Sequence, residues 1–134
     1  MVKASHLKKV YRAGEIDLEV IKDFSLEINE GEFVSLVGPS GSGKSTVLHM
    51  LGCLDTPTSG EIIIDGVSTK AMSRTQRANF RGENIGFIFQ SFNLIPVLSV
   101  YENIEYPLIM IQNLSESERK SRVLKLLEEV GMLE

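Results

Sequence analysis

The sequence predicts an α/β fold in which a parallel sheet is buried against helices. Three observations predict it. Residues 33–37, FVSLV, form a short apolar run of the kind found in strands buried on both faces. A glycine-rich turn follows at once and leads into KSTVLHMLGCL, which has helical character. A second apolar run, NIGFIFQ at 84–90, predicts another buried strand later in the chain.

The residues before the first apolar run predict two further strands. VKASHL alternates loosely between polar and apolar residues. DFSLEI places Phe24, Leu26 and Ile28 on one face, which is the two-residue period of a strand. NEGE at 29–32 predicts the turn that separates these strands from the buried run. The chain is therefore expected to begin with a β-rich region.

After the first helix, DTPTSG predicts a break in regular structure. EIIIDG predicts a strand that ends in a hairpin turn at Asp65 and Gly66. Residues 69–81 have the composition of a polar helix.

The last predicted helix has a signal at each end. Ser115 and Glu118 have the spacing of a capping box, and Gly131 stands where a C-terminal glycine cap is expected. Val123, Leu127 and Val130 share one face, which we expect to be buried.

Composition limits the class of protein. The 134 residues are enough for one ordinary domain, and 14 Lys and Arg against 18 Asp and Glu give a net charge of −4. A nucleic-acid binder usually has a clustered basic excess, so we predict no nucleic-acid partner.

The single cysteine, Cys53, cannot form an internal disulfide, which favours a reducing cytoplasm. The first residues lack the apolar core of a signal peptide, and no apolar window approaches the roughly 20 residues of a membrane span. Any membrane-spanning part is therefore expected in a partner.

Residues Gly38 to Ser45 fit the pattern G-x-x-x-x-G-K-[ST] without a mismatch. Gly41 and Gly43 lack a Cβ, so the backbone can curl around phosphates with its N–H groups pointing inward. The start of the next helix adds its positive dipole end. The alternative to a phosphate site is a structural glycine-rich turn in which the lysine occurs by chance. A dinucleotide site fits less well, because Thr46 stands where G-x-G-x-x-G needs glycine.

Each polar residue of this stretch has an expected role. Lys44 would reach the β- and γ-phosphates of ATP, Ser45 would offer its hydroxyl to Mg²⁺, and Thr46 could donate to the α-phosphate. We call residues 38–46 the phosphate loop, and we predict that all nine bind nucleotide: Gly38, Pro39, Ser40, Gly41, Ser42, Gly43, Lys44, Ser45 and Thr46.

Beyond the loop, the chain resembles the ATP-binding subunit of ABC transporters over nearly its whole length. The stretches that carry the resemblance are KVYRAGEIDLEVIKDFSLEINEGEFVSLVGPSGSGKST, LGCLDTPTSGEIIIDG and GFIFQSFNLIPVLSVYENI. Their amino-acid sequences are most similar to those of the lipoprotein-release and macrolide-export branch. The resemblance implies a P-loop NTPase with a RecA-like core and an N-terminal antiparallel β subdomain, incomplete at the C-terminus. Residues 1–134 would then be the N-terminal portion of one nucleotide-binding domain. Residues 1–92 would form the β subdomain and P-loop core, and 93–134 the start of a helical subdomain.

The resemblance also implies roles for two residues outside the loop. Tyr11 would stack on the adenine base, and Gln90 would touch Mg²⁺ and the attacking water and report the nucleotide state to the membrane subunit. Lys44 and Gln90 would thus be catalytic, with Ser45 and Gln90 at the metal. Taken alone, Tyr11 would be a half-buried strand tyrosine and Gln90 a surface residue.

The partners implied are an integral-membrane transporter subunit and a second nucleotide-binding subunit, at the cytoplasmic face of the cell membrane. The family's hydrolytic motifs, an LSGGQ-like signature, an apolar run ending in Asp-Glu and a switch histidine, do not occur in these 134 residues. We therefore expect close to no hydrolysis by this chain. We also expect a longer subunit, a partner segment or self-association to cover FVSLV and GFIFQ. A native gene product of the mass of these 134 residues would contradict a longer subunit.

Two other functions stay open. A guanylate-kinase-like phosphotransferase has a similar loop, but that loop lies near the chain start, whereas here 37 residues precede it. A non-catalytic nucleotide-binding module would bind ATP and never hydrolyse it. The remaining polar or reactive residues are expected to be structural or solvated: His6, His49, Cys53, Glu102, Glu105 and a basic stripe of Lys70, Arg74, Arg77 and Arg81.

Overall fold

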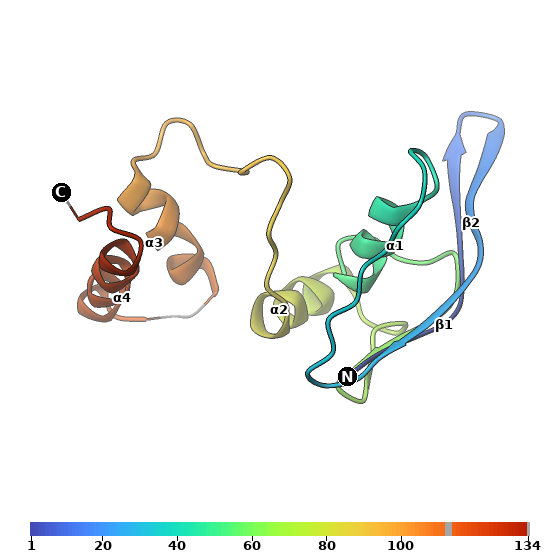
Figure 1. Ribbon diagram of the computed structural model, residues 1–134, viewed down its shortest axis with the longest axis horizontal. Helices are drawn as coiled ribbons and strands as arrows, with labels where there is room; N and C mark the ends of the chain where they lie inside the picture. Colours follow the sequence, from blue (N-terminus) through green and yellow to red (C-terminus); the bar gives the residue numbers. More distant parts are fainter. Residues whose placement is uncertain (112–113, 134) are drawn as a thin grey trace. The chain divides into compact units, whose positions relative to one another are not determined.

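The computed structural model describes residues 1–111 and 114–133 and divides into two compact units, Met1–Ile85 and Gly86–Glu134 (Figure 1). Glu134 lies outside the described residues. The unit boundary follows Ile85, and the functional division into 1–92 and 93–134 stays a prediction.

The first unit contains a four-stranded antiparallel sheet. Its strands are β1 (Val2–Ala13), β2 (Ile16–Ile28), β3 (Ser59–Ile64) and β4 (Val67–Ser68), in the spatial order β2-β1-β3-β4. Every neighbouring pair is antiparallel. The predicted β-rich start is confirmed.

The β3–β4 hairpin has the predicted two-residue turn. Asp65 and Gly66 both have positive φ, 47° and 79°, as a type I′ hairpin loop requires. Gly66 adopts this conformation without the steric cost that a side chain would bring.

A close backbone contact joins β3 to β1. The register of β1 shifts between Ser5 and Lys8, where His6 has φ 49°. Gly60 of β3 has φ +93°, and a Cβ on it would lie 2.4 Å from the His6 carbonyl oxygen and 2.6 Å from that of Ser5. Only glycine fits this site without a shift of the backbone.

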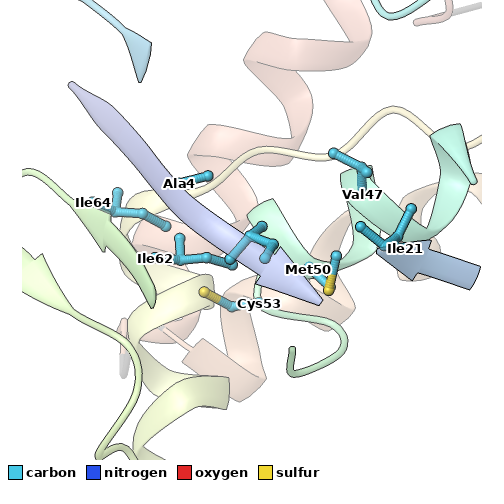
Figure 2. Close-up of a cluster of buried hydrophobic side chains, with 8 residues drawn as sticks. Ala4, Ile21, Val47, Met50, Cys53, Ile62 and Ile64 are labelled. Carbon is cyan, nitrogen blue, oxygen red and sulfur yellow. The ribbon is translucent and has the colours of Figure 1, made fainter. Parts of the chain in front are cut away.

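Two helices accompany the sheet, α1 (Lys44–Leu51) and α2 (Arg74–Asn84). The predicted helix over 69–81 therefore starts later, because Ser73 and Gln76 form a capping box that begins the helix at Arg74. The core lies between α1 and the sheet, and Phe80 and Ile85 pack against it (Figure 2). Its buried members are Ala4, Leu7, Ile21, Val47, Met50, Cys53, Ile62 and Ile64.

The second unit pairs α3 (Val100–Ile111) with α4 (Glu116–Glu129). The Arg119 Nε donates to Glu105 Oε1 at 3.0 Å, with both side chains about one-fifth exposed. Val123 and Leu127 are buried, as predicted. No helix among the described residues is long and apolar enough to cross a membrane.

The ends of α4 match their sequence signals. Ser115 and Glu118 form the predicted capping box, and Gly131 follows the helix with φ 69°. Val130, however, is 66% exposed, so its predicted place on the buried face is wrong. It is the C-cap residue, and the helical face does not continue through it.

The two predicted central strands are not formed. Residues 33–37 belong to no strand, Asn84 ends α2, and residues 86–90 are irregular. Phe33, Val37 and Ile88 are almost fully exposed, at 97%, 91% and 104%. A strand needs a hydrogen-bonded neighbour, and within residues 1–111 and 114–133 neither segment pairs with one. The α/β class is confirmed, and the antiparallel sheet agrees with the N-terminal β subdomain that the resemblance implies. The predicted parallel sheet does not form among residues 1–111 and 114–133.

Candidate nucleotide-binding site

The phosphate loop ends at the N-terminus of α1 through two left-handed glycines. Gly41 has φ 78°, and Gly43, the N-cap residue, has φ 88° with no side-chain cap. A Cβ on Gly43 would lie 2.5 Å from Ile21 Cδ1, so β2 packs directly against the loop. The first N–H groups of a helix have no acceptor within it, which leaves those of α1 available to an anion.

The Lys44 side chain folds back across the loop. Its Nζ donates to the carbonyl oxygens of Gly38 and Pro39 at 2.8 and 2.7 Å and lies 3.4 Å from Ser42 Oγ. The loop carbonyls thus hold the ammonium group in the middle of the turn. The structure therefore holds a cation within the loop that leads into α1.

Gly41, Gly43 and Lys44 line a hollow of about 310 Å³. The Ser45 side chain is exposed in its lining, and Thr46, one residue further along α1, is half-buried. The volume is at the lower end of the roughly 300–1,000 Å³ of small-molecule sites. The full lining is Val20, Ser40, Gly41, Gly43, Lys44, Ser45 and Thr46.

Tyr11 lies close to the start of α1. Its hydroxyl donates to Asp55 Oδ2 at 2.7 Å, and the residue is 38% exposed. The hydrogen bond to Asp55, with a smaller contribution from burial, raises the pKa of Tyr11, while the nearby Thr46 side chain lowers it. The predicted base-facing aromatic and the predicted α-phosphate ligand are therefore neighbours.

Behind Tyr11 is an ion pair that the sequence reasoning missed. The Lys9 Nζ donates to Asp55 Oδ1 at 2.6 Å and to the Thr56 carbonyl at 2.7 Å, and it lies 4.6 Å from the Tyr11 ring centroid. Burial tends to raise the pKa of Asp55, but hydrogen bonds from Lys9, Tyr11 and the Thr56 amide outweigh it and lower the pKa. The carboxylate is therefore the stable form. Asp55 stands in the DTPTSG break, and only its neighbours in space reveal its role.

Gln90 belongs to the second unit and is exposed in an irregular segment. The rings of Phe87 and Phe89, just before it, stack with centroids 5.4 Å apart. The structure brings Tyr11 and the phosphate loop together in the first unit, and the role of Gln90 stays a prediction.

The basic stripe of α2 differs from expectation. Arg77 Nη2 donates to the Met72 carbonyl and Arg81 Nη1 to the Cys53 carbonyl, each at 3.0 Å. Both side chains are half-buried, so the expected solvated face is wrong for these two, whereas Lys70 and Arg74 are exposed. Among residues 1–111 and 114–133, no three His, Cys, Asp or Glu side chains gather in a group that could hold a metal ion.

Comparison with known proteins places the sequence in a family. A family model described as ABC transporter matches residues 21–134. The ABC transporter ATP-binding protein MJ0796 of Methanocaldococcus jannaschii is 46% identical over 130 residues, which are 96% of this chain and 55% of that protein. The lipoprotein-releasing system ATP-binding protein LolD of Psychrobacter arcticus is 39% identical over 98% of the chain and 58% of its own length.

A third relative is the macrolide export ATP-binding/permease protein MacB of Syntrophobacter fumaroxidans, 42% identical over 98% of the chain and 19% of that protein. The resemblance to the lipoprotein-release and macrolide-export branch is thus confirmed. A solved dimeric structure of the ATP-binding cassette MJ0796, bound to ADP and Pi, superposes with a TM-score of 0.87 and covers 98% of the chain and 57% of that cassette. The chain therefore spans a little over half the length of MJ0796 and LolD. The family model covers most of the chain and the structural agreement extends over nearly all of it, so the chain belongs to the ABC transporter family.

Proposed function

We propose that this chain binds MgATP through the phosphate loop and, as part of a full-length subunit, hydrolyses it to drive transport by a membrane partner. One observation carries the proposal: the Lys44 ammonium lies against the carbonyls of Gly38 and Pro39, where α1 begins. A cation, free helix amides and left-handed glycines together meet the need of a polyphosphate for close donors.

A magnesium ion fits the same residues. The Ser45 hydroxyl is exposed in the hollow beside Lys44, and hydroxyl and amide oxygens are the hard donors that Mg²⁺ prefers. Ser45 would hold the ion in the first unit, and the ion supplies positive charge at the β- and γ-phosphates when bound. The metal role of Gln90 is proposed from the family resemblance alone. Lys44 would hold the same phosphates from the loop side.

The base would lie on Tyr11. Its partly exposed ring neighbours Thr46, so a nucleotide with its α-phosphate at Thr46 brings its base toward Tyr11. Base–aromatic stacking is worth about 1–3 kcal/mol in nucleic-acid binders, enough to favour ATP over a bare polyphosphate.

The larger assembly follows from the family. One relative is named an ATP-binding protein of a lipoprotein-releasing system and another an ATP-binding/permease protein, and the solved structure of the MJ0796 cassette is dimeric. We infer that the full-length subunit pairs with a second copy and with an integral-membrane subunit at the cytoplasmic face of the cell membrane. Gln90 would couple the nucleotide site to that membrane partner.

Binding without hydrolysis is the second candidate for the 134 residues alone. The sequence holds no apolar run ending in Asp-Glu, and general-base assistance contributes about 10²–10⁴ in rate. Phosphate release from MgATP should therefore stay near the uncatalysed level. Transfer of phosphate from ATP to GMP would instead favour the phosphotransferase.

The test is a calorimetric titration of the chain with ATP in the presence of Mg²⁺. Lys44→Ala removes the loop cation and should weaken binding by roughly 10- to 100-fold, the effect of losing charge-assisted hydrogen bonds. Lys125→Ala is the matched control, because that lysine is 76% exposed on α4 of the second unit. Equal affinities for the wild-type chain and Lys44→Ala would show that the loop is not the site.

A further inference from the structure

Neither Lys9 nor Asp55 lines the hollow at the phosphate loop. Lys9 is 8% exposed, an unusual position for a lysine on a strand. Both carboxylate oxygens of Asp55 are used, Oδ1 by Lys9 and the Thr56 amide and Oδ2 by the Tyr11 hydroxyl. The Lys9–Asp55 pair therefore contacts Tyr11 through both of its members, Asp55 at the hydroxyl and Lys9 at the ring.

These contacts restrain the Tyr11 ring in three ways. The hydroxyl is held by Asp55 at 2.7 Å, the Lys9 ammonium lies 4.6 Å from the ring centroid, and the backbone is paired with Leu18 of β2. A phenol ring without such contacts would be free to change rotamer.

The restraint extends to α1. The Asp55 amide donates to the His49 carbonyl at 3.1 Å, and the Leu54 amide donates to the same oxygen at 2.8 Å. Asp55 is thus tied to the last turns of the helix whose first turn follows the phosphate loop. Through Asp55, the orientation of the Tyr11 ring is linked to the position of the loop.

We propose that Lys9 and Asp55 are positioning residues that hold the Tyr11 ring ready for the base of a nucleotide whose phosphates occupy the loop. The inference rests on the proposed function. An ammonium already covers one ring face, so the base stacks on the other. Ordering the ring before binding removes the entropy cost of immobilising it on binding, worth roughly up to tenfold in affinity.

The experiment compares two ligands on the full chain, MgATP and magnesium tripolyphosphate, which has no base. Tyr11→Ala, Asp55→Asn and Tyr11→Phe should each weaken ATP binding and leave tripolyphosphate binding unchanged. For Asp55→Asn and Tyr11→Phe the loss should be roughly fivefold to tenfold. Adding Asp55→Asn to Tyr11→Ala should cause no further loss, because the two changes remove one shared effect. Asp65→Asn is the matched control, since that carboxylate lies in the β3–β4 turn and contacts the chain's own N-terminal amine.

Three results would overturn the inference. Equal losses of ATP and tripolyphosphate affinity in Asp55→Asn would mean that the pair only supports the loop. An unchanged ATP affinity in Asp55→Asn and Tyr11→Phe, with a loss in Tyr11→Ala, would mean that the ring needs no positioning. If Tyr11→Ala binds ATP as the wild type does and Lys44→Ala binds it more weakly, the base does not contact Tyr11, but the loop is still the phosphate site. If the wild-type chain binds neither ligand, the proposed function itself is wrong.

A spectroscopic readout needs no nucleotide. In a Tyr101→Phe, Tyr106→Phe background, Tyr11 is the one remaining tyrosine, since the sequence has three. Asp55 and Thr46 lie at its hydroxyl and the Lys9 ammonium lies over its ring, and Asp55→Asn should lower the Tyr11 pKa toward its ordinary value of about 10. An unchanged tyrosinate titration in a variant that circular dichroism shows to be folded would contradict the hydrogen bond on which the inference depends.

Discussion

Gly43 and Gly60 each combine a left-handed backbone with a close neighbour. A Cβ at Gly43 would meet the movable tip of Ile21, whereas one at Gly60 would meet the backbone of Ser5 and His6. Gly14 has a similar φ of +65° with open space around it. Substitution at Gly14 therefore tests backbone strain alone, whereas substitution at Gly43 or Gly60 tests strain together with steric overlap.

We predict a graded loss of stability for substitution by alanine. Gly14→Ala should cost about 1–2 kcal/mol, the penalty of the left-handed region alone. Gly43→Ala should cost more and also weaken ATP binding, and Gly60→Ala should cost the most because backbone cannot move aside. Urea unfolding of the three variants measures the order. Equal losses at all three positions would show that the contacts add nothing to the strain.

The phosphate loop can be proposed from the sequence because its spacing is local and each residue type has a chemical reason, and nucleotide binding by its residues stays a prediction. The sequence could not predict Lys9 and Asp55, which lie 46 positions apart and match no spacing rule. The role of a buried ion pair depends on what surrounds it, and only the fold supplies those surroundings.

Among the elements, those with local end signals were predicted best. The capping box of α4 and the Asp65–Gly66 turn both formed as expected. The helix α3 was missed, although Ser99 and Glu102 exchange hydrogen bonds at its start in the manner of a capping box. Pro107 inside an apolar stretch obscured the helical pattern.

Pro107 leaves α3 one backbone hydrogen bond short, because proline has no N–H to donate to the Asn103 carbonyl. Pro107→Ala should restore that bond and stabilise the helix, by up to about 3 kcal/mol if the proline lies in a regular helical turn. Hydrogen exchange of the α3 amides and far-ultraviolet circular dichroism measure the gain. Pro96→Ala, outside any helix, is the control. Lower protection in Pro107→Ala would indicate that the proline ring is needed for packing.

For the whole molecule, the α/β class and the family were predictable, and the central sheet was not. An apolar run such as FVSLV shows that a segment favours burial, but a sheet also requires neighbouring strands at a distance in sequence. Phe33, Val37 and Ile88 are instead exposed within the described chain. Gly43 of the phosphate loop packs on Ile21 of β2, which lies with Val47 of α1 in the core.

Because Cys53 is buried, chemical modification of its thiol reports unfolding of the first unit. The thiol is 2% exposed in the core, and burial raises its pKa although Arg77 and Arg81 lower it, so at neutral pH it is protonated and shielded. An alkylating reagent should therefore modify the chain only as fast as the core opens, and one cysteine per chain makes each event countable by mass spectrometry. Saturating MgATP should slow that modification, and Lys44→Ala should abolish the slowing. Alkylation as rapid as that of a free thiol would contradict a closed core.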